Sequence, residues 1–314
     1  TIALMHRYLF VLAEESERMR RARLSRTFRK EAAFNGERFQ LSSASFSFGL
    51  GTGGTDLRGD VFERMAMNAI EVSNLRYRYH DGTEALRGIS FHVAAGECVA
   101  VLGPNGSGKS TLLLHLNGIL PERIETPSPI QILGEPLVSA NLQKVRRQVG
   151  LLFQDPDDQL FCPTVEEDVA FGPQQLGFSE AEIRARVQKA LAEVRMEGFE
   201  HRATHHLSHG EKRRVCLAGV LACEPAILVM DELTSDLDPR GRRDFKALLR
   251  QIPATKLIAT HDLELAVELC SRAIVLDRGE IVADGPTREL LNNEELMLAH
   301  GLERPHILRH IHPH

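Results

Sequence analysis

A glycine-rich loop with the sequence GPNGSGKST, at residues 103–111, constrains this chain more than any other feature. The short apolar segment CVAVL at 98–102 leads directly into it and has the composition of a buried strand. After the loop, Leu112, Leu113, Leu116 and Ile119 recur at helical spacing. The sequence therefore predicts a strand, a tight glycine loop and a helix, in that order.

The spacing of this loop matches the P-loop pattern, in which glycine, four residues, glycine, lysine and serine follow one another. Glycines let backbone N–H groups approach phosphate oxygens without a Cβ in the way, and the helix dipole adds positive charge. A glycine-rich turn that binds nothing would not need a strand and a helix on the correct sides. We expect a nucleoside triphosphate to be bound by Gly103, Pro104, Asn105, Gly106, Ser107, Gly108, Lys109, Ser110 and Thr111.

A second site is expected where the apolar segment AILVM at 226–230 ends in Asp231 and Glu232. Mg²⁺ prefers oxygen ligands, so Asp231 is predicted to hold it, through water, opposite the Ser110 hydroxyl. Glu232 is then the natural general base for an attacking water. The alternative is a solvated strand end without a function.

Strands and helices alternate along the chain. Ile183, Val187, Leu191 and Val194 form one helical face, and KLIAT at 256–260 is a further buried strand. This alternation predicts an α/β fold with a largely parallel sheet covered on both faces. Paired strands are expected around the turn at 81–82, and a hairpin around 278–279.

Composition narrows the class of protein. The chain has 314 residues, of which 43% are hydrophobic, enough for one large or two modest domains. Its net charge of -5 argues against nucleic acid as a partner. Five cysteines without a CxxC pair indicate reduced thiols of a cytosolic compartment that pack in the core. No apolar run approaches the roughly 18 residues of a membrane-spanning helix.

Four further segments follow in a fixed order: LLFQDPDDQLF, HHLSHGEKRR, TSDLDP and LIATHDLE. Together with the two sites above, they resemble the ATP-binding cassette of ABC transporters. The resemblance implies a P-loop NTPase, an ABC ATPase with a RecA-like core, an antiparallel β subdomain and a helical subdomain. It also implies ATP hydrolysis by a dimer that clasps ATP between its two subunits.

The resemblance implies a role for each matching residue. Gln154 would contact Mg²⁺ and the attacking water, and His261 would hold the γ-phosphate. Tyr79 would stack on adenine. Ser208 and Gly210 of the signature segment would face the ATP of the partner subunit, and the D-loop, Asp236 to Asp238, would cross the same interface.

Three residues differ from the consensus sequence of the family. His209 replaces a glycine and Glu211 a glutamine in the signature, while Leu233 replaces a proline after Glu232. The substitution at 209 bears on the geometry of subunit pairing.

The segment QDPDDQLFCPTVEEDVAFGP at 154–173 resembles the ATPase subunits of energy-coupling-factor importers, which bring cobalt, nickel or vitamins into cells. The matching Asp157, Asp158, Gln159 and Phe161 would line a groove for the transmembrane coupling subunit, unless they only cap the helical subdomain. The resemblance implies a peripheral protein at the cytoplasmic face of the cell membrane that works with a coupling subunit and a substrate-capture subunit. We expect import of cobalt or nickel, with a vitamin importer of this class or another ABC transporter as the alternative.

The chain divides into four predicted segments. Residues 1–40 are basic and resemble a coupling-subunit fragment around Arg21-Ala22-Arg23, although an amphipathic surface helix is the alternative. Residues 41–66 are a Ser- and Gly-rich linker, which suggests a truncated fusion or read-through with an independent start at Met67 or Met65. The cassette spans 67–285, with its helical subdomain at about 155–225. A helical tail at 286–314 carries His306, His310, His312 and His314, which suit transition metals or are incidental.

Two further functional classes remain open on the sequence alone. A soluble cassette of translation or DNA repair usually has two cassettes or a long coiled-coil insertion, and neither is seen in the sequence. The second open class is a regulatory cassette that does not hydrolyse ATP. The transported substrate is not encoded here, because selectivity resides on another polypeptide, and the partner ATPase is either identical or a paralogue.

Overall fold

The computed structural model describes residues 68–124 and 126–309. The predictions for residues 1–40 and 41–66, the proposed starts at Met65 and Met67, and the last three tail histidines lie outside this range. The described residues form two sheets. The smaller, antiparallel sheet has the order β2-β1-β4-β5, with bounds β1 (Asn68–Arg78), β2 (Glu84–Ala94), β4 (Ile130–Ile132) and β5 (Glu135–Pro136).

The larger sheet has six strands in the order β10-β9-β3-β8-β7-β6. Their bounds are β3 (Cys98–Leu102), β6 (Val149–Leu152), β7 (Ile227–Asp231), β8 (Thr255–Ala259), β9 (Arg272–Asp277) and β10 (Glu280–Pro286). Neighbouring strands from β9 to β6 are parallel, and only β10 runs antiparallel at the edge. The β9–β10 hairpin turns at Arg278 and Gly279, both with positive φ, as the sequence predicted.

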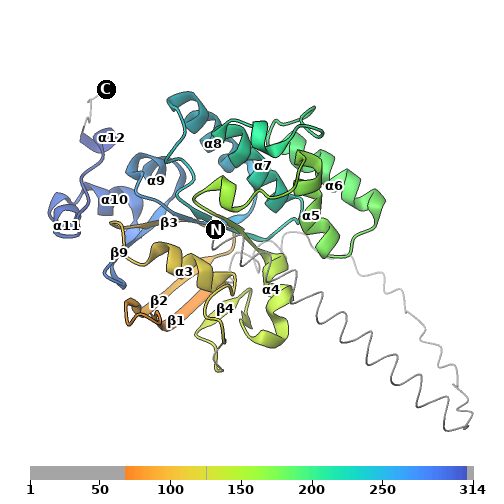
Figure 1. Cartoon of the computed structure of the whole chain (residues 1–314). Helices are drawn as coiled ribbons and strands as arrows, with labels where there is room; N and C mark the ends of the chain where they lie inside the picture. Colours follow the sequence, from red (N-terminus) through yellow and green to blue (C-terminus); the bar gives the residue numbers. More distant parts are fainter. Residues whose placement is uncertain (1–67, 125, 310–314) are drawn as a thin grey trace, which may run out of the picture. The chain divides into compact units, whose positions relative to one another are not determined.

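Helices cover both faces of the large sheet (Figure 1). Their bounds are α3 (Lys109–Leu116), α4 (Leu142–Gln148), α5 (Val165–Gln175), α6 (Glu180–Glu193), α7 (His209–Leu221), α8 (Pro239–Gln251), α9 (Leu263–Leu269), α10 (Thr287–Asn292), α11 (Glu294–Ala299) and α12 (His306–Arg309). Short 3₁₀ turns are η1 (Ser139–Asn141), η2 (Pro156–Asp158) and η3 (Thr204–His206). Helix α3 ends at Leu116, so Ile119 packs beyond the helix and not on its face.

Strand β3 shows why the sheet is buried on both sides. Val99 and Val101 point into a core formed with the antiparallel sheet and with α3, whereas Ala100 and Leu102 point into a second core. The second core contains α5 to α9 and the C-terminal helices. Because side chains alternate along a strand, an uninterrupted apolar strand is needed to fill two cores.

The helices α5, α6 and α7 pack on one another (Figure 1), and they lie within the range 155–225 that the sequence analysis assigned to a helical subdomain. Their first turns are closed by capping boxes, in which Thr164 pairs with Glu167, Ser179 with Glu182, and Ser208 with Glu211. On α6, Val187 and Leu191 are buried, as the helical spacing predicted.

All five cysteines are free thiols, but only Cys216 and Cys270 are fully buried, so the prediction of core packing holds in full for these two. The described residues include no helix long and apolar enough to span a membrane. They also include no cluster of three or more His, Cys, Asp or Glu side chains arranged to hold a metal ion.

Candidate active site

The glycine loop joins β3 to α3 as predicted, and its geometry requires glycine at two positions. A Cβ on Gly103 would lie 2.0 Å from the backbone oxygen of Leu276, and one on Gly108 would lie 2.6 Å from that of Ala85. Gly108 also caps α3 with a φ of 105°, a left-handed conformation that costs other residues energy. The backbone of the loop therefore packs closely against the backbones of β9 and β2.

The loop has the features of an anion site. The Nζ of Lys109 donates hydrogen bonds to the carbonyl oxygens of Gly103, at 2.8 Å, and Pro104, at 3.0 Å. No side chain caps the first turn of α3, and the buried Oγ of Ser107 has no partner among the described residues. Burial lowers the pKa of Lys109, while the charges of Glu232 and Asp231 oppose that shift. A polyphosphate would supply the missing acceptors.

Asp231 ends strand β7 beside this loop. Its Oδ1 is buried and lacks a hydrogen-bond partner among the described residues. Burial raises the pKa of Asp231, whereas a hydrogen bond with Ser110 and the charge of Lys109 lower it. An unpartnered carboxylate oxygen next to a hydroxyl is the donor set that a hard cation such as Mg²⁺ takes, so these residues fit the ion.

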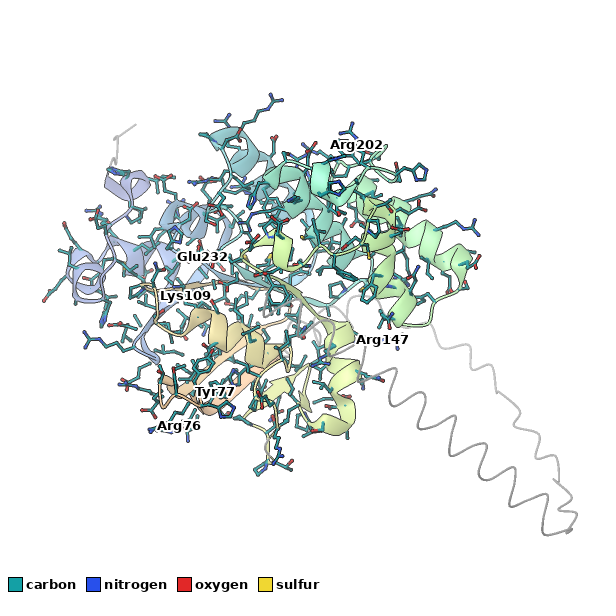
Figure 2. The ribbon with its side chains drawn as sticks, viewed as in Figure 1. Arg76, Tyr77, Lys109, Arg147, Arg202 and Glu232 are labelled. Carbon is teal, nitrogen blue, oxygen red and sulfur yellow. The ribbon has the colours of Figure 1, made fainter. Side chains whose placement is uncertain are left out.

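Glu232 follows Asp231 and is held by two residues at the end of β8. Its Oε2 lies 2.7 Å from Nδ1 of His261 and accepts a 3.3 Å hydrogen bond from Oγ1 of Thr260. The Glu232 side chain is 9% exposed and that of His261 is 58% exposed. Figure 2 shows Glu232 and Lys109 in the same part of the molecule. The sequence did not predict Thr260, although its position immediately before His261 was a signal.

Gln154 and Tyr79 approach the same region from other elements. Gln154 lies just beyond β6, which pairs with β7 in parallel, so it is at the sheet edge where Asp231 lies, with an exposed side chain. The hydroxyl of Tyr79 lies 2.9 Å from Oγ1 of Thr111 in the first turn of α3, and Tyr79 remains 36% exposed. An aromatic surface is thus available beside the loop.

The signature segment is not part of this cluster. Ser208 caps α7, whose buried residues belong to the second core, whereas those of α3 belong to the first. The Ser208 hydroxyl and backbone N–H both bond Oε2 of Glu211, each at 2.7 Å. A single chain therefore presents the glycine loop and the Ser208–Gly210 turn on elements that cover opposite faces of the sheet.

The departures at 209 and 233 have different surroundings. The His209 Nε2 lies 3.7 Å from Oδ2 of Asp236. Leu233 is 2% exposed and belongs to the second core, which explains how an apolar residue is accommodated after Glu232.

Comparison with known proteins identifies the family. The model of the ABC transporter family matches residues 86–235. An ABC transporter ATP-binding protein of Gloeobacter violaceus is 55% identical over 236 residues, covering 74% of this chain and 96% of its own length. The energy-coupling factor transporter ATP-binding protein EcfA of Methanothermobacter thermautotrophicus is 47% identical over 241 residues, covering 75% of this chain and 76% of its own.

Solved structures agree with this assignment. The cbiO1 protein of Clostridium perfringens, described as part of the ABC transporter complex cbiONQ, has a TM-score of 0.65 at 38% identity, covering 77% of this chain and 98% of that one. A dimeric ATP-binding cassette bound to ADP and Pi has a TM-score of 0.62 at 27% identity, and the match covers 69% of this chain and 98% of that one. The predicted fold class, ATP hydrolysis and the need for ATP with Mg²⁺ are thereby confirmed. With its glycine loop, its Asp231–Glu232 strand end and these relatives, this chain belongs to the ABC transporter ATP-binding proteins and is an ATPase of the energy-coupling-factor type.

Proposed function

We propose that this chain is the ATPase subunit of an energy-coupling-factor importer for cobalt or nickel and acts as a dimer at the cytoplasmic face of the membrane. The proposal of a dimer rests on one observation: Ser208 and Lys109 lie at the starts of two helices, α7 and α3, that pack in different cores. If both segments contact one ATP, they come from two subunits. The relatives that are energy-coupling factor transporter ATP-binding proteins support the transporter class. The choice of cobalt or nickel rests on the sequence resemblance of residues 154–173 and on the tail histidines.

The site residues have distinct proposed roles. The backbone of the loop from Gly103 to Thr111 binds the phosphates, and Lys109 turns from its two carbonyl partners to bridge the β- and γ-phosphates. Ser110, Gln154 and Asp231 hold Mg²⁺, which neutralises the developing charge on the phosphates when it is bound. Tyr79 stacks on the adenine. In the partner subunit, the turn formed by Ser208 and Gly210 faces the γ-phosphate.

Glu232 and His261 perform the chemistry in this proposal. Glu232 orients the attacking water and accepts its proton on a carboxylate oxygen. The exposed His261, 2.7 Å away, fixes that carboxylate and contacts the γ-phosphate. Water is excluded only when the second subunit covers the site, which links hydrolysis to dimer closure.

The coupling subunit is proposed to dock on the segment after β6. Phe161 is partly exposed and packs edge to face on Phe171, with ring centroids 4.7 Å apart. Asp157 is paired with Lys212 at 2.6 Å. Gln159 is only 7% exposed and bonds the backbone of Phe153, so we leave it out of the proposed groove.

Two experiments test this function. The chain is co-expressed with its membrane subunits, and uptake of radioactive Co²⁺ and Ni²⁺ is measured beside that of a labelled vitamin. Metal uptake that is lost in Glu232→Gln supports the proposal, whereas vitamin uptake alone overturns the metal assignment. Phe161→Ala should abolish co-purification with the coupling subunit, while Phe178→Ala, which removes a ring packed under Arg186 in the same subdomain, should not.

A further inference from the structure

The first arginine after the signature turn, Arg213, is buried to an unusual degree for a cation. Its side chain is 2% exposed, and Nε and Nη1 have no hydrogen-bond partner in the described part of the chain. Burial lowers the pKa of its guanidinium, and the charge of Asp236 only partly opposes this. A buried charge with so little compensation costs folding free energy, so its presence points to a role other than stability.

The remaining nitrogen of Arg213 contacts the D-loop of the same chain. Its Nη2 lies 3.4 Å from Oγ of Ser235 and 3.5 Å from Oδ2 of Asp236. His209, one turn earlier on α7, lies 3.7 Å from the same Asp236 oxygen. The first turns of α7 are therefore connected to the D-loop by two side chains, one of which is the residue that departs from the usual glycine.

The connection continues to the backbone of Glu232. The Ser235 hydroxyl donates a 3.0 Å hydrogen bond to the carbonyl oxygen of Glu232 while its oxygen accepts from Arg213. Glu232 has a φ of 45°, a left-handed conformation that is unfavourable for a residue other than glycine. Such a conformation persists only when its surroundings hold it. Its N–H is held by the carbonyl of Ala259, at 2.9 Å, and its carbonyl by Ser235.

We propose that Arg213 is a positioning residue that transmits the position of the signature helix α7 to Glu232 through the Ser235 hydroxyl. The inference rests on the proposed roles of Ser208 and Glu232. When Ser208 engages the ATP of the partner subunit, α7 is fixed, and the Arg213–Ser235 contact fixes the strained backbone that presents Glu232. ATP bound by one subunit thereby prepares the general base of the other.

The test separates positioning from stability and from nucleotide affinity. Phosphate release by the full chain is measured for Arg213→Met, Arg213→Lys, Ser235→Ala and the double variant Arg213→Met/Ser235→Ala. Binding of a fluorescent ATP analogue and the Tm are measured on the same samples. Arg186→Met is the matched control, because it removes another largely buried, ion-paired arginine, 2.9 Å from Glu224 in the helical subdomain.

We expect kcat to fall at least about tenfold in Arg213→Met, equivalent to about 1.4 kcal/mol, with KM for ATP changed less than about twofold. Arg213→Lys should restore part of kcat. The double variant should be no slower than the slower single variant, because both act along one path. Should Arg213→Met not fold, Ser235→Ala, which removes only a hydroxyl, still has to lower kcat.

Three results would overturn the inference. They are a wild-type kcat in Arg213→Met or Ser235→Ala, losses that multiply in the double variant, and an equal loss in Arg186→Met. Failure of the import assignment is distinguishable, because it appears in the uptake assay and leaves these hydrolysis ratios unchanged.

Discussion

Nδ1 of His261 and Oε2 of Glu232 lie 2.7 Å apart, at the ends of two adjacent parallel strands, β8 and β7. The pair brings together the carboxylate that the sequence predicted as general base and the histidine expected at the γ-phosphate. Thr260 adds a second hydrogen bond to the same oxygen.

Replacement of Glu232 by Gln should separate binding from turnover. The amide keeps the size of the side chain but does not accept a proton, so phosphate release should fall by about 10²- to 10⁴-fold while ATP still binds. With Mg-ATP the variant should run as a dimer in size-exclusion chromatography. Glu264→Gln, an exposed change on α9, should behave as wild type. Full turnover in Glu232→Gln would remove the general-base assignment.

Gly103→Ala should weaken ATP binding because the new Cβ would lie 2.0 Å from the Leu276 oxygen, a contact that only a backbone shift relieves. Overpacking strain of about 1–3 kcal/mol corresponds to roughly 5- to 150-fold in affinity, measured by titration calorimetry. Gly82→Ala is the matched control: its φ is also positive, at 91°, but no atom lies within 4 Å of its Cβ. Equal ATP affinity in the two variants would contradict the steric argument.

Glu211→Gln should strengthen ATP-driven dimerisation. Glu211 accepts both hydrogen bonds of Ser208 and places a negative charge where the partner's γ-phosphate is proposed to lie. Glutamine preserves the capping box, so the Tm should change little, while the repulsion is removed. Dimer dissociation constants are compared at low and high salt in a Glu232→Gln background, with the gain expected to shrink as salt rises.

The control for this charge effect is Glu182→Gln. Glu182 forms the same capping box with Ser179, at 2.8 and 2.7 Å, on α6. It should leave dimerisation unchanged. If both variants strengthen the dimer equally, the effect comes from net charge and not from the position of Glu211.

His115 should make stability depend on pH. The ring is 1% exposed, its Nδ1 donates to the Thr111 carbonyl at 2.7 Å, and burial lowers its pKa from 6.5. In the unfolded chain the His115 imidazole therefore binds a proton as the pH falls through about 6.5, whereas in the folded chain it binds this proton only at lower pH. This contribution to stability is present above pH 6.5 and is lost as pH falls through that value toward the lower folded pKa, by at most about 1.4 kcal/mol per pH unit.

Urea unfolding of wild type, His115→Gln and His92→Gln between pH 5 and 8 checks this expectation. His115→Gln should flatten the dependence below pH 6.5, and His92→Gln, which removes an exposed imidazole, is the matched control. An unchanged slope in His115→Gln would show that other groups cause the pH dependence.

Local sequence determined much of this protein. The P-loop spacing, the apolar strands of five residues and the turn at Arg278 and Gly279 each leave a pattern within a short stretch of sequence, so pattern and turn chemistry sufficed to predict them. Family resemblance added the roles of Gln154, Tyr79 and His261, which no local rule supplies.

Only the tertiary structure revealed the contacts that join distant segments. The Asp157–Lys212 pair, the Thr260–Glu232 hydrogen bond and the Arg213–Ser235 contact span 55, 28 and 22 residues. The separation of Ser208 from Lys109 is decided by which face of the sheet each helix covers. Hydrophobic periodicity shows that a helix has an apolar face, but the strand order selects the core against which that face packs.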